Sequence, residues 1–202
     1  NEAKAEIKKE PMSFLKIDRP ETNFEDSVDT YDPRVYGRAA ELLDSMIRDG
    51  SFIQDDKPCY YVYELTMDGR SQTGIAAVCS ADDYENRVIK KHENTRADKE
   101  ADRIRHVEAC NAQTGPIFLA YRADDTISTI TEHVKKVTEP VYDFRSDDGI
   151  LHRIWIISMD RDIETITNAF RDMRSIYIAD GHHRCASAVK VCLKKRAEAG
   201  SD

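Results

Sequence analysis

Five consecutive residues combine groups that hold phosphate in proteins: Asp180, Gly181, His182, His183 and Arg184. An apolar run precedes them and an alanine-rich stretch follows, which predicts a strand that turns into a helix. The first amides of a helix have no partner within it and the helix dipole is positive there, so anions bind. We expect the imidazoles and the guanidinium to contact a phosphate or carboxylate. We also expect Gly181 to have a positive φ or to lie close to the ligand.

Three roles are open to Asp180 at the end of the predicted strand. Its carboxylate can hold Mg²⁺, orient a histidine such as His182, or cap the following helix. The two histidines and the arginine that follow it favour a functional acid. Cys185 comes next, at a helix start where a thiolate is stabilised, but the favoured interpretation is a small side chain that packs the helix onto a strand.

A second polar cluster lies in the middle of the chain. It consists of His92, Glu93, Asn94, Thr95 and Arg96, followed by Lys99, Asp102 and Arg103. Such a run is often a solvated helix face whose charges pair with one another, but it also offers a general base or metal ligand at Glu93 and phosphate ligands at His92 and Arg103. An HExxH zinc motif is excluded because Arg96 stands where the second histidine is needed. We expect Glu93 and Asp180 to approach one cleft.

Hydrophobic periodicity predicts the elements that position these residues. Asp32-Pro33 opens a helix that Gly50 ends. Asp68-Gly69 and Asp147-Asp148-Gly149 each join two strand-like runs and predict antiparallel hairpins. The expected strands are 13–17, 60–65, 73–79, 116–121, 141–145, 151–158 and 175–179, and further helices are expected at 97–112, 127–137 and 162–173. Because regular βαβ repetition is missing, the fold class is α+β, with a mixed or mainly antiparallel sheet and flanking helices.

The overall composition excludes some classes of protein. With 202 residues and 40% hydrophobic content, the chain can bury a core, either as a single α+β domain or as a two-lobed one. Its net charge of -8 argues against electrostatic binding of nucleic acid or anionic membranes. No apolar stretch reaches the length of a bilayer span. Five cysteines without a CxxC pair suit a reducing compartment, so we expect a cytoplasmic protein.

Several motifs together resemble one family. They are Ser13-Phe14-Leu15, His92-Glu93-x-Thr95, Lys99-x-x-Asp102-Arg103, Pro116-Ile117-Phe118 and Ile178-Ala179-Asp180-Gly181-His182-His183-Arg184. In this order they are similar to a domain-of-unknown-function family, number one-zero-one-five, whose members are typically longer and usually carry Tyr where Cys185 stands. The resemblance implies a fragment of a longer protein, in which a 92–121 segment holds the central motifs and a 150–196 segment holds the loop.

The loop 180–184 also looks like the signature loop of the ParB and sulfiredoxin superfamily, which includes free-serine kinases. This resemblance implies a nucleotide-dependent phosphotransferase that uses Mg²⁺ with ATP or ADP and acts on a small molecule such as serine. In this scheme Asp180 holds the metal or orients His182, the residues 181–184 hold the phosphates, and Glu93 is the base.

Two alternatives to the phosphotransferase stay open. The first is a regulatory module that binds nucleotide without chemistry, and the second is a metal-dependent phosphoester hydrolase. DNA binding is set aside because the chain is acidic and shows no helix-turn-helix pattern. The expected partners are therefore a nucleotide and a small-molecule substrate, with no nucleic acid and no membrane, and the sequence predicts no oligomeric state.

Overall fold

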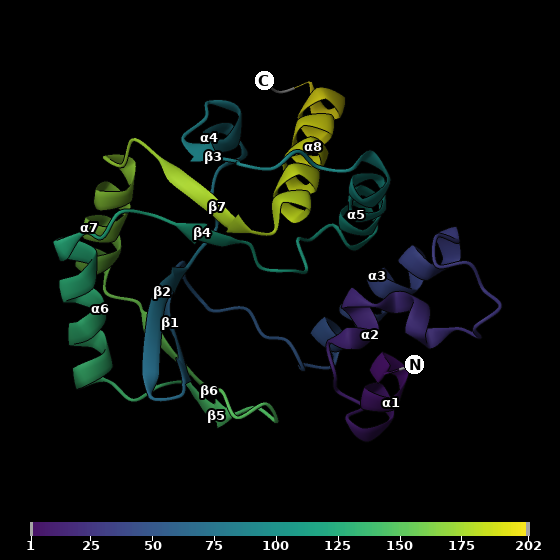
Figure 1. The fold of residues 1–202 in the computed structure, drawn as a ribbon, viewed down its shortest axis with the longest axis horizontal. Coiled ribbons are helices and arrows are strands. Elements are labelled where there is room, and N and C mark those ends of the chain that lie inside the picture. Colours follow the sequence, from purple (N-terminus) through teal and green to yellow (C-terminus); the bar gives the residue numbers. More distant parts are fainter. Residues whose placement is uncertain (1, 201–202) are drawn as a thin grey trace. The chain divides into compact units, whose positions relative to one another are not determined.

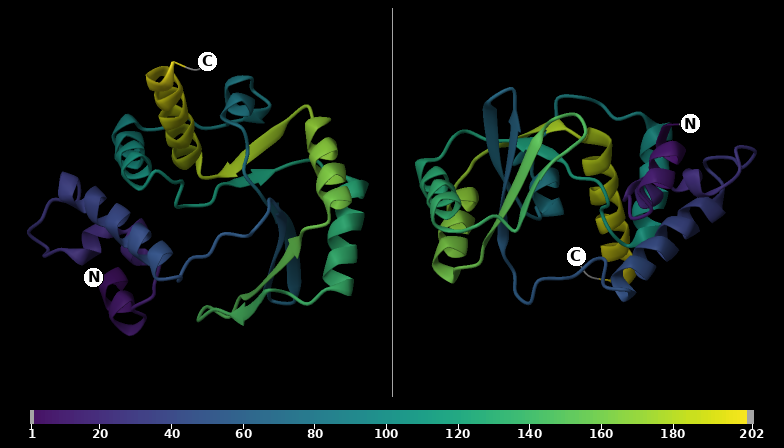
Figure 2. Two further views of the ribbon diagram at one scale, coloured as in Figure 1. Left: turned by 180° about the vertical axis from the view of Figure 1, so that it is seen from behind. Right: turned by 90° about the horizontal axis from the view of Figure 1, so that it is seen from below.

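The computed structural model describes residues 2–200 and has an α+β fold, as predicted (Figures 1 and 2). These residues form two compact units, each built from segments that lie far apart in the sequence. Unit 1 consists of the residues up to Ile53, Tyr84–Ala120 and the residues from Tyr177 onwards, and unit 2 consists of Gln54–Asp83 and Tyr121–Ile176. The 92–121 segment lies almost wholly in unit 1, whereas the 150–196 segment is divided between the two units.

Unit 2 contains an antiparallel sheet with the strand order β2-β1-β6-β5. Its strands are β1 (Tyr60–Met67), β2 (Arg70–Ala76), β5 (Tyr142–Arg145) and β6 (Leu151–Ile157), so both predicted hairpins are confirmed. Asp68 and Gly69 form the first turn with φ values of 51° and 77°. Two successive left-handed residues match the twist of the strands, which is why Asp-Gly at this position is a strong hairpin signal.

Two predicted helices, α6 (Asp125–Val137) and α7 (Asp160–Arg171), pack side by side and contribute to the core of unit 2 (Figure 1). That core consists of Val62, Val134, Trp155, Ile157 and Ile166. Helix α6 begins after Asp124, whose side chain accepts a hydrogen bond from the backbone N–H of Ile127 at 3.0 Å. This cap satisfies one of the free amides of the helix and fixes where it begins.

A buried carboxylate lies beside this core. The side chain of Glu64 is 5% exposed and accepts hydrogen bonds from Lys135 at 2.9 Å and from Arg153. Burial acts to raise the pKa of Glu64, but the hydrogen bond from Lys135 and the charges of Lys135 and Arg153 outweigh burial and hold the pKa below its ordinary value. Glu64 thus links β1 to β6 and α6 by charge as well as by packing.

One part of unit 1, formed by its first segment together with α5 (Ala97–Cys110), is helical. Its elements are α1 (Glu2–Lys9), α2 (Leu15–Asp18), the 3-10 turn η1 (Pro20–Asn23), α3 (Pro33–Arg48) and α5. The helix predicted from Asp32-Pro33 is confirmed, because Asp32 accepts a hydrogen bond from the N–H of Arg34 at 2.9 Å and Gly50 has a positive φ of 81° after the last turn.

The strand predicted at 13–17 is wrong, because this segment contains the helical turn α2. Ile17 is completely buried there, and its carbonyl accepts a hydrogen bond from Nε2 of His106 on α5 at 2.8 Å. Over five residues an alternating pattern and one face of a helical turn look alike, so periodicity could not separate them. The buried contacts that this segment makes with α5 and α3 stabilise the helical turn.

The rest of unit 1 is a small sheet with helices beside it. The strand order is β3-β7-β4, with β3 (Ile89–Lys90), β7 (Ile176–Asp180) and β4 (Phe118–Ala120), and β4 runs antiparallel to β7. Helix α8 (His182–Ala199) begins directly after β7 and packs along α5 (Figure 2). Ile89, Ile178 and Cys185 form the core between the sheet and α8, which agrees with the packing interpretation of Cys185.

Several of the elements that the sequence did not predict are short. Helix α4 (Ala81–Glu85), strand β3 and turn η1 each contain too few residues to establish a hydrophobic periodicity. None of the helices within residues 2–200 has the length and apolar character needed to cross a membrane.

The buried ion pairs of Glu64 with Lys135 and Arg153 predict how the stability of the fold depends on pH. Glu64→Gln should lower the free energy of unfolding at neutral pH by about 3 kcal/mol, because it leaves two partly buried cations without their anion. A carboxylate with a lowered pKa stabilises the fold above the unfolded-state pKa near 4.5, and this stability is lost as the pH falls through the folded-state pKa. The difference between wild type and Glu64→Gln in urea unfolding should therefore shrink as the pH is lowered below that value.

A matched control is Glu132→Gln, since Glu132 pairs with the same Lys135 at 2.6 Å but is 67% exposed. This variant should change stability by less than about 1 kcal/mol. Equal losses in the two variants would show that burial of Glu64 is not what makes its ion pairs stabilising.

Candidate functional site

The junction between β7 and α8 is a single residue, Gly181, which has a φ of 92° and occupies the N-cap position of the helix. The expected positive φ is confirmed. A Cβ atom added to Gly181 would lie 3.5 Å from Cα of Ile117 and 3.6 Å from Nε of Arg184, which are ordinary contact distances. The left-handed conformation, rather than lack of space, is therefore what requires glycine here.

The start of α8 offers free backbone donors. Gly181 has no side chain that could cap the helix, and the first backbone bond back to it comes from the N–H of Cys185 at 2.9 Å. The amides of residues 182–184 precede that bond, so they lack helical acceptors, and the positive end of the helix dipole lies at the same place. This confirms the predicted strand-turn-helix geometry of the loop and gives it the local charge that favours an anion.

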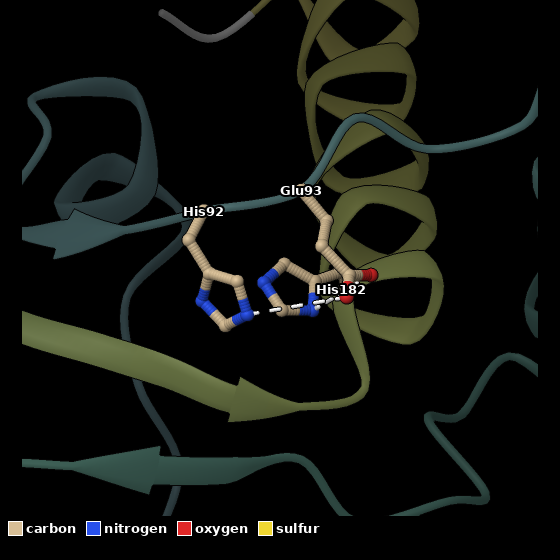
Figure 3. A group of neighbouring side chains, drawn as sticks. All are labelled: His92, Glu93 and His182. Atoms are coloured by element: carbon tan, nitrogen blue, oxygen red, sulfur yellow. Dashed lines mark ion pairs between the residues drawn. The ribbon is translucent and has the colours of Figure 1, made fainter.

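His182, the first residue of α8, brings the two polar clusters together (Figure 3). Its Nδ1 lies 3.8 Å from Oε2 of Glu93, and its ring meets the ring of His92 edge to face with 4.4 Å between centroids. The side chain of His182 is 6% exposed, and its Nε2 is buried without a hydrogen-bond partner. A buried polar nitrogen without a partner is costly, which makes this imidazole a candidate ligand-binding group.

His92 and Glu93 follow β3 and have exposed side chains, at 61% and 63%. Nε2 of His92 and Oε1 of Glu93 are 4.0 Å apart, so both side chains turn toward the start of α8 while remaining accessible to solvent (Figure 3). The structure thus joins Glu93 to the loop through His182, and the carboxylate of Asp180 is directed to Arg184 instead.

Arg184 fastens the loop to the segment before β4. Its Nη2 donates to Oδ2 of Asp180 at 3.2 Å and its Nη1 donates to the carbonyl of Pro116. A Cβ atom on Gly115 would lie only 2.9 Å from Cδ of Arg184, so a side chain at position 115 would displace the arginine from this place. Sequence reasoning missed Gly115, although the Gly-Pro pair was a visible turn signal. Without a bound anion, the guanidinium already has acceptors within the chain.

His183 and the residues around it form a layer beneath the loop. Nδ1 of His183 is buried without a hydrogen-bond partner. Glu100 on α5 is buried and accepts hydrogen bonds from Lys190 and Thr95. The bond from Lys190, followed by the bond from Thr95, holds the pKa of Glu100 below its ordinary value. Ser187 donates to the carbonyls of Glu100 and His183 at 3.3 and 2.7 Å. Lys190 and Ser187 of α8 therefore join this helix to Glu100 of α5, and Thr95 orients the Glu100 carboxylate.

Other residues of the second cluster have contacts on a different part of unit 1. Arg103 pairs with Asp18 at 3.4 Å and with Asp102 at 3.6 Å, and Asp102 accepts a hydrogen bond from the Tyr36 hydroxyl at 2.7 Å. Burial and the hydrogen bond to Asp102 raise the pKa of Tyr36 to about 12. These contacts attach α5 to α2 and α3, and the structure does not bring Arg103 into contact with the loop 180–184 within the described residues.

Two depressions of the described surface lie away from the loop. One is lined by residues of α5 and α8 near their C-terminal ends, among them Val107, Asn111, Val191 and Lys195. The other lies between α6 and α7 in unit 2. Neither of these two depressions is lined by Glu93 or by residues 180–184.

Comparison with protein families assigns the chain to one family. The family described as "Protein of unknown function (DUF1015)" matches residues 1–202, and the chain belongs to this family. The family resemblance seen in the motifs is thereby confirmed. Neither the curated proteins nor the solved structures contain a significant match. The likeness of the loop to the ParB and sulfiredoxin superfamily stays a prediction.

The left-handed conformation of Gly181 can be tested by its effect on stability. Gly181→Ala should destabilise the fold by about 1–3 kcal/mol, because a residue with a Cβ is strained in this region. Gly37→Ala is the matched control, since Gly37 lies within α3, has no positive φ and has nothing within 4 Å of an added Cβ. That variant should stabilise by about 0.5–1 kcal/mol through helix propensity. Urea unfolding of both variants measures the contrast, and similar changes would contradict a requirement for glycine at 181.

Proposed function

We propose that the chain binds the phosphates of a nucleotide at the start of α8 and transfers a phosphoryl group to a hydroxyl of a small molecule. The observation that carries the proposal is the approach of Glu93 to His182, at 3.8 Å, on the first residue of a helix with a free N-terminus. A base and a phosphate-binding element then lie side by side. Phosphoryl transfer depends mainly on positioning and on charge neutralisation, and both can be supplied by such an arrangement.

The phosphate site in this proposal uses the donors of the loop. The amides of residues 182–184 and the positive end of the helix dipole lie at one terminus of α8, and His183 on the same turn has a buried Nδ1 without a partner. Arg184 adds a guanidinium once its contact with Asp180 is exchanged for phosphate oxygens. That contact is a weak restraint because the Asp180 side chain is 75% exposed, and exposed ion pairs contribute at most about 1 kcal/mol.

Exchange of the Arg184 contact also gives Asp180 a role. Once Arg184 binds phosphate, the carboxylate of Asp180 is released next to that phosphate. A carboxylate together with phosphate oxygens is the usual ligand set of Mg²⁺, which keeps several waters. The expected cofactor is therefore Mg²⁺ with ATP or ADP, in agreement with the role proposed for Asp180 from the sequence.

Glu93 is the general base in the proposed reaction. Its carboxylate takes the proton of the acceptor hydroxyl as the hydroxyl oxygen forms a bond to the terminal phosphorus of the nucleotide. The bond between that phosphorus and the bridging oxygen breaks, and the nucleotide leaves with one phosphate fewer. His182, whose Nδ1 lies 3.8 Å from Glu93, donates to the phosphate in this scheme. The acceptor is a small alcohol, and free serine is the first to test.

Binding of nucleotide is tested by Arg184→Gln. The variant should bind ATP or ADP about 10- to 100-fold more weakly, because a hydrogen bond to a charged group contributes about 1.5–3 kcal/mol. Thermal shift and calorimetric titration with each nucleotide, with and without Mg²⁺, measure the change. Circular dichroism is needed beside them, since Arg184 also holds the carbonyl of Pro116. The control is Arg174→Gln, at an exposed arginine of unit 2, which should bind nucleotide as wild type does. If a folded Arg184→Gln variant binds nucleotide as tightly as wild type, the phosphates bind elsewhere.

Chemistry is tested separately by Glu93→Gln. With Mg²⁺, nucleotide and a pool of small alcohols that includes serine, ³¹P NMR should detect a new phosphomonoester in wild type. Glu93→Gln should lower kcat by about 10²- to 10⁴-fold while nucleotide affinity is kept, because only the proton acceptor is lost. Glu85→Gln, at an exposed glutamate of α4, is the control and should transfer normally. Binding without transfer would indicate the regulatory module, and phosphoester hydrolysis without transfer would indicate the hydrolase.

A further inference from the structure

Three side chains at the start of α8 form a group with the chemistry of a metal site. His92, Glu93 and His182 each offer one ligand atom, and these atoms all lie within 4.8 Å of one another. Two come from the exposed segment after β3 and one from the buried first turn of α8 (Figure 3). The sequence alone excluded the HExxH arrangement, and the structure supplies the second histidine from a distant segment instead.

A second observation points independently to a ligand. Nε2 of His182 is buried without a hydrogen-bond partner on a side chain that is 6% exposed. The nearest polar ring is His92, but the two imidazoles meet edge to face at 4.4 Å without a hydrogen bond between them within the described residues. Nδ1 of His182 is also 3.8 Å from the Glu93 carboxylate, beyond hydrogen-bond distance. Of these three side chains only His182 carries the cost of a buried, unmade hydrogen bond, because His92 and Glu93 are exposed to solvent.

We propose that His92, Glu93 and His182 bind one divalent first-row transition-metal ion, with Zn²⁺ or Co²⁺ as the best match. Two neutral imidazoles and one carboxylate suit these ions, whereas Mg²⁺ and Ca²⁺ prefer oxygen ligands alone. Three protein ligands leave a position open for water or substrate. The carboxylate neutralises half of the ionic charge, and the exposure of His92 and Glu93 gives the ion a path to the site.

The site requires a modest closure that the structure permits. Bonds of about 2.0–2.2 Å to a tetrahedral ion place ligand atoms about 3.4 Å apart, closer than the 4.8 Å limit of this group. His182 is fixed within α8, while the side chains of His92 and Glu93 are 61% and 63% exposed and free to rotate. Closure therefore comes from the exposed pair moving onto the buried ligand.

Metal binding stands on this geometry and does not depend on the proposed phosphotransfer. The metal site uses Glu93 as a ligand, whereas the phosphotransfer uses it as a general base, and a carboxylate that ligates a metal is not free to accept a proton. The two ideas are separable by experiment: metal binding is measured without nucleotide, and phosphotransfer is measured with Mg²⁺ after transition metals have been removed by chelation. Failure of one measurement leaves the other unaffected.

The test uses the full chain without a polyhistidine tag, stripped with EDTA. Calorimetric titration with Zn²⁺ and the visible absorption of added Co²⁺ should reveal one ion per chain, with binding that excess Mg²⁺ does not reduce. His92→Ala and Glu93→Gln change exposed side chains and should each weaken binding by at least about 10-fold. His182→Gln should do the same, and its circular dichroism and metal-free unfolding temperature establish that it remains folded.

The matched control is His133→Ala, which removes an exposed histidine on α6 in unit 2 and should bind the ion as wild type does. Loss of one ion per chain in the three site variants, but not in His133→Ala, supports the proposal. The proposal is overturned if wild type takes up no stoichiometric ion, or if His92→Ala and Glu93→Gln bind it as tightly as wild type.

Discussion

Gly181 has a φ of 92°, and this left-handed residue lets the chain leave β7 and begin α8 with no intervening loop. A residue with a side chain adopts this conformation only at a cost, so the junction depends on glycine. Because β7 lies between β3 and β4, the start of α8 is brought next to the residues that follow β3 and precede β4. The contacts of His182 with Glu93 and of Arg184 with Pro116 both follow from this placement.

The loop 180–184 contains Arg184, whose hydrogen bonds are made within the chain, and His182, which has an unpartnered nitrogen. Arg184 is satisfied by Asp180 and the carbonyl of Pro116, and Gly115 leaves the space that its side chain needs. By contrast, a nitrogen of His182 is buried without a partner beside an exposed carboxylate. Natural proteins rarely leave such nitrogens without a partner, so the proposed phosphate and metal-ion sites both include His182.

Much of the fold was predictable because its signals are local. Asp32 as a helix cap, Asp68-Gly69 as a hairpin turn and Gly181 as a left-handed junction each act through residues next to them in the chain. The strand expected at 13–17 was wrong because five residues are too few to distinguish an alternating from a helical pattern, and the burial of Ile17 against α5 decided its conformation.

The sequence by itself determined the family, the α+β class, most helices and strands, and the start of α8 as a polar site. It also predicted that the two polar clusters, around Glu93 and Asp180, approach one cleft, but not which side chains meet. Only the tertiary structure decided that Glu93 meets His182, whereas Arg103 pairs with Asp18. The physical reason is that caps and turns depend on near neighbours, whereas these contacts depend on strand pairing and helix packing between segments far apart in the chain.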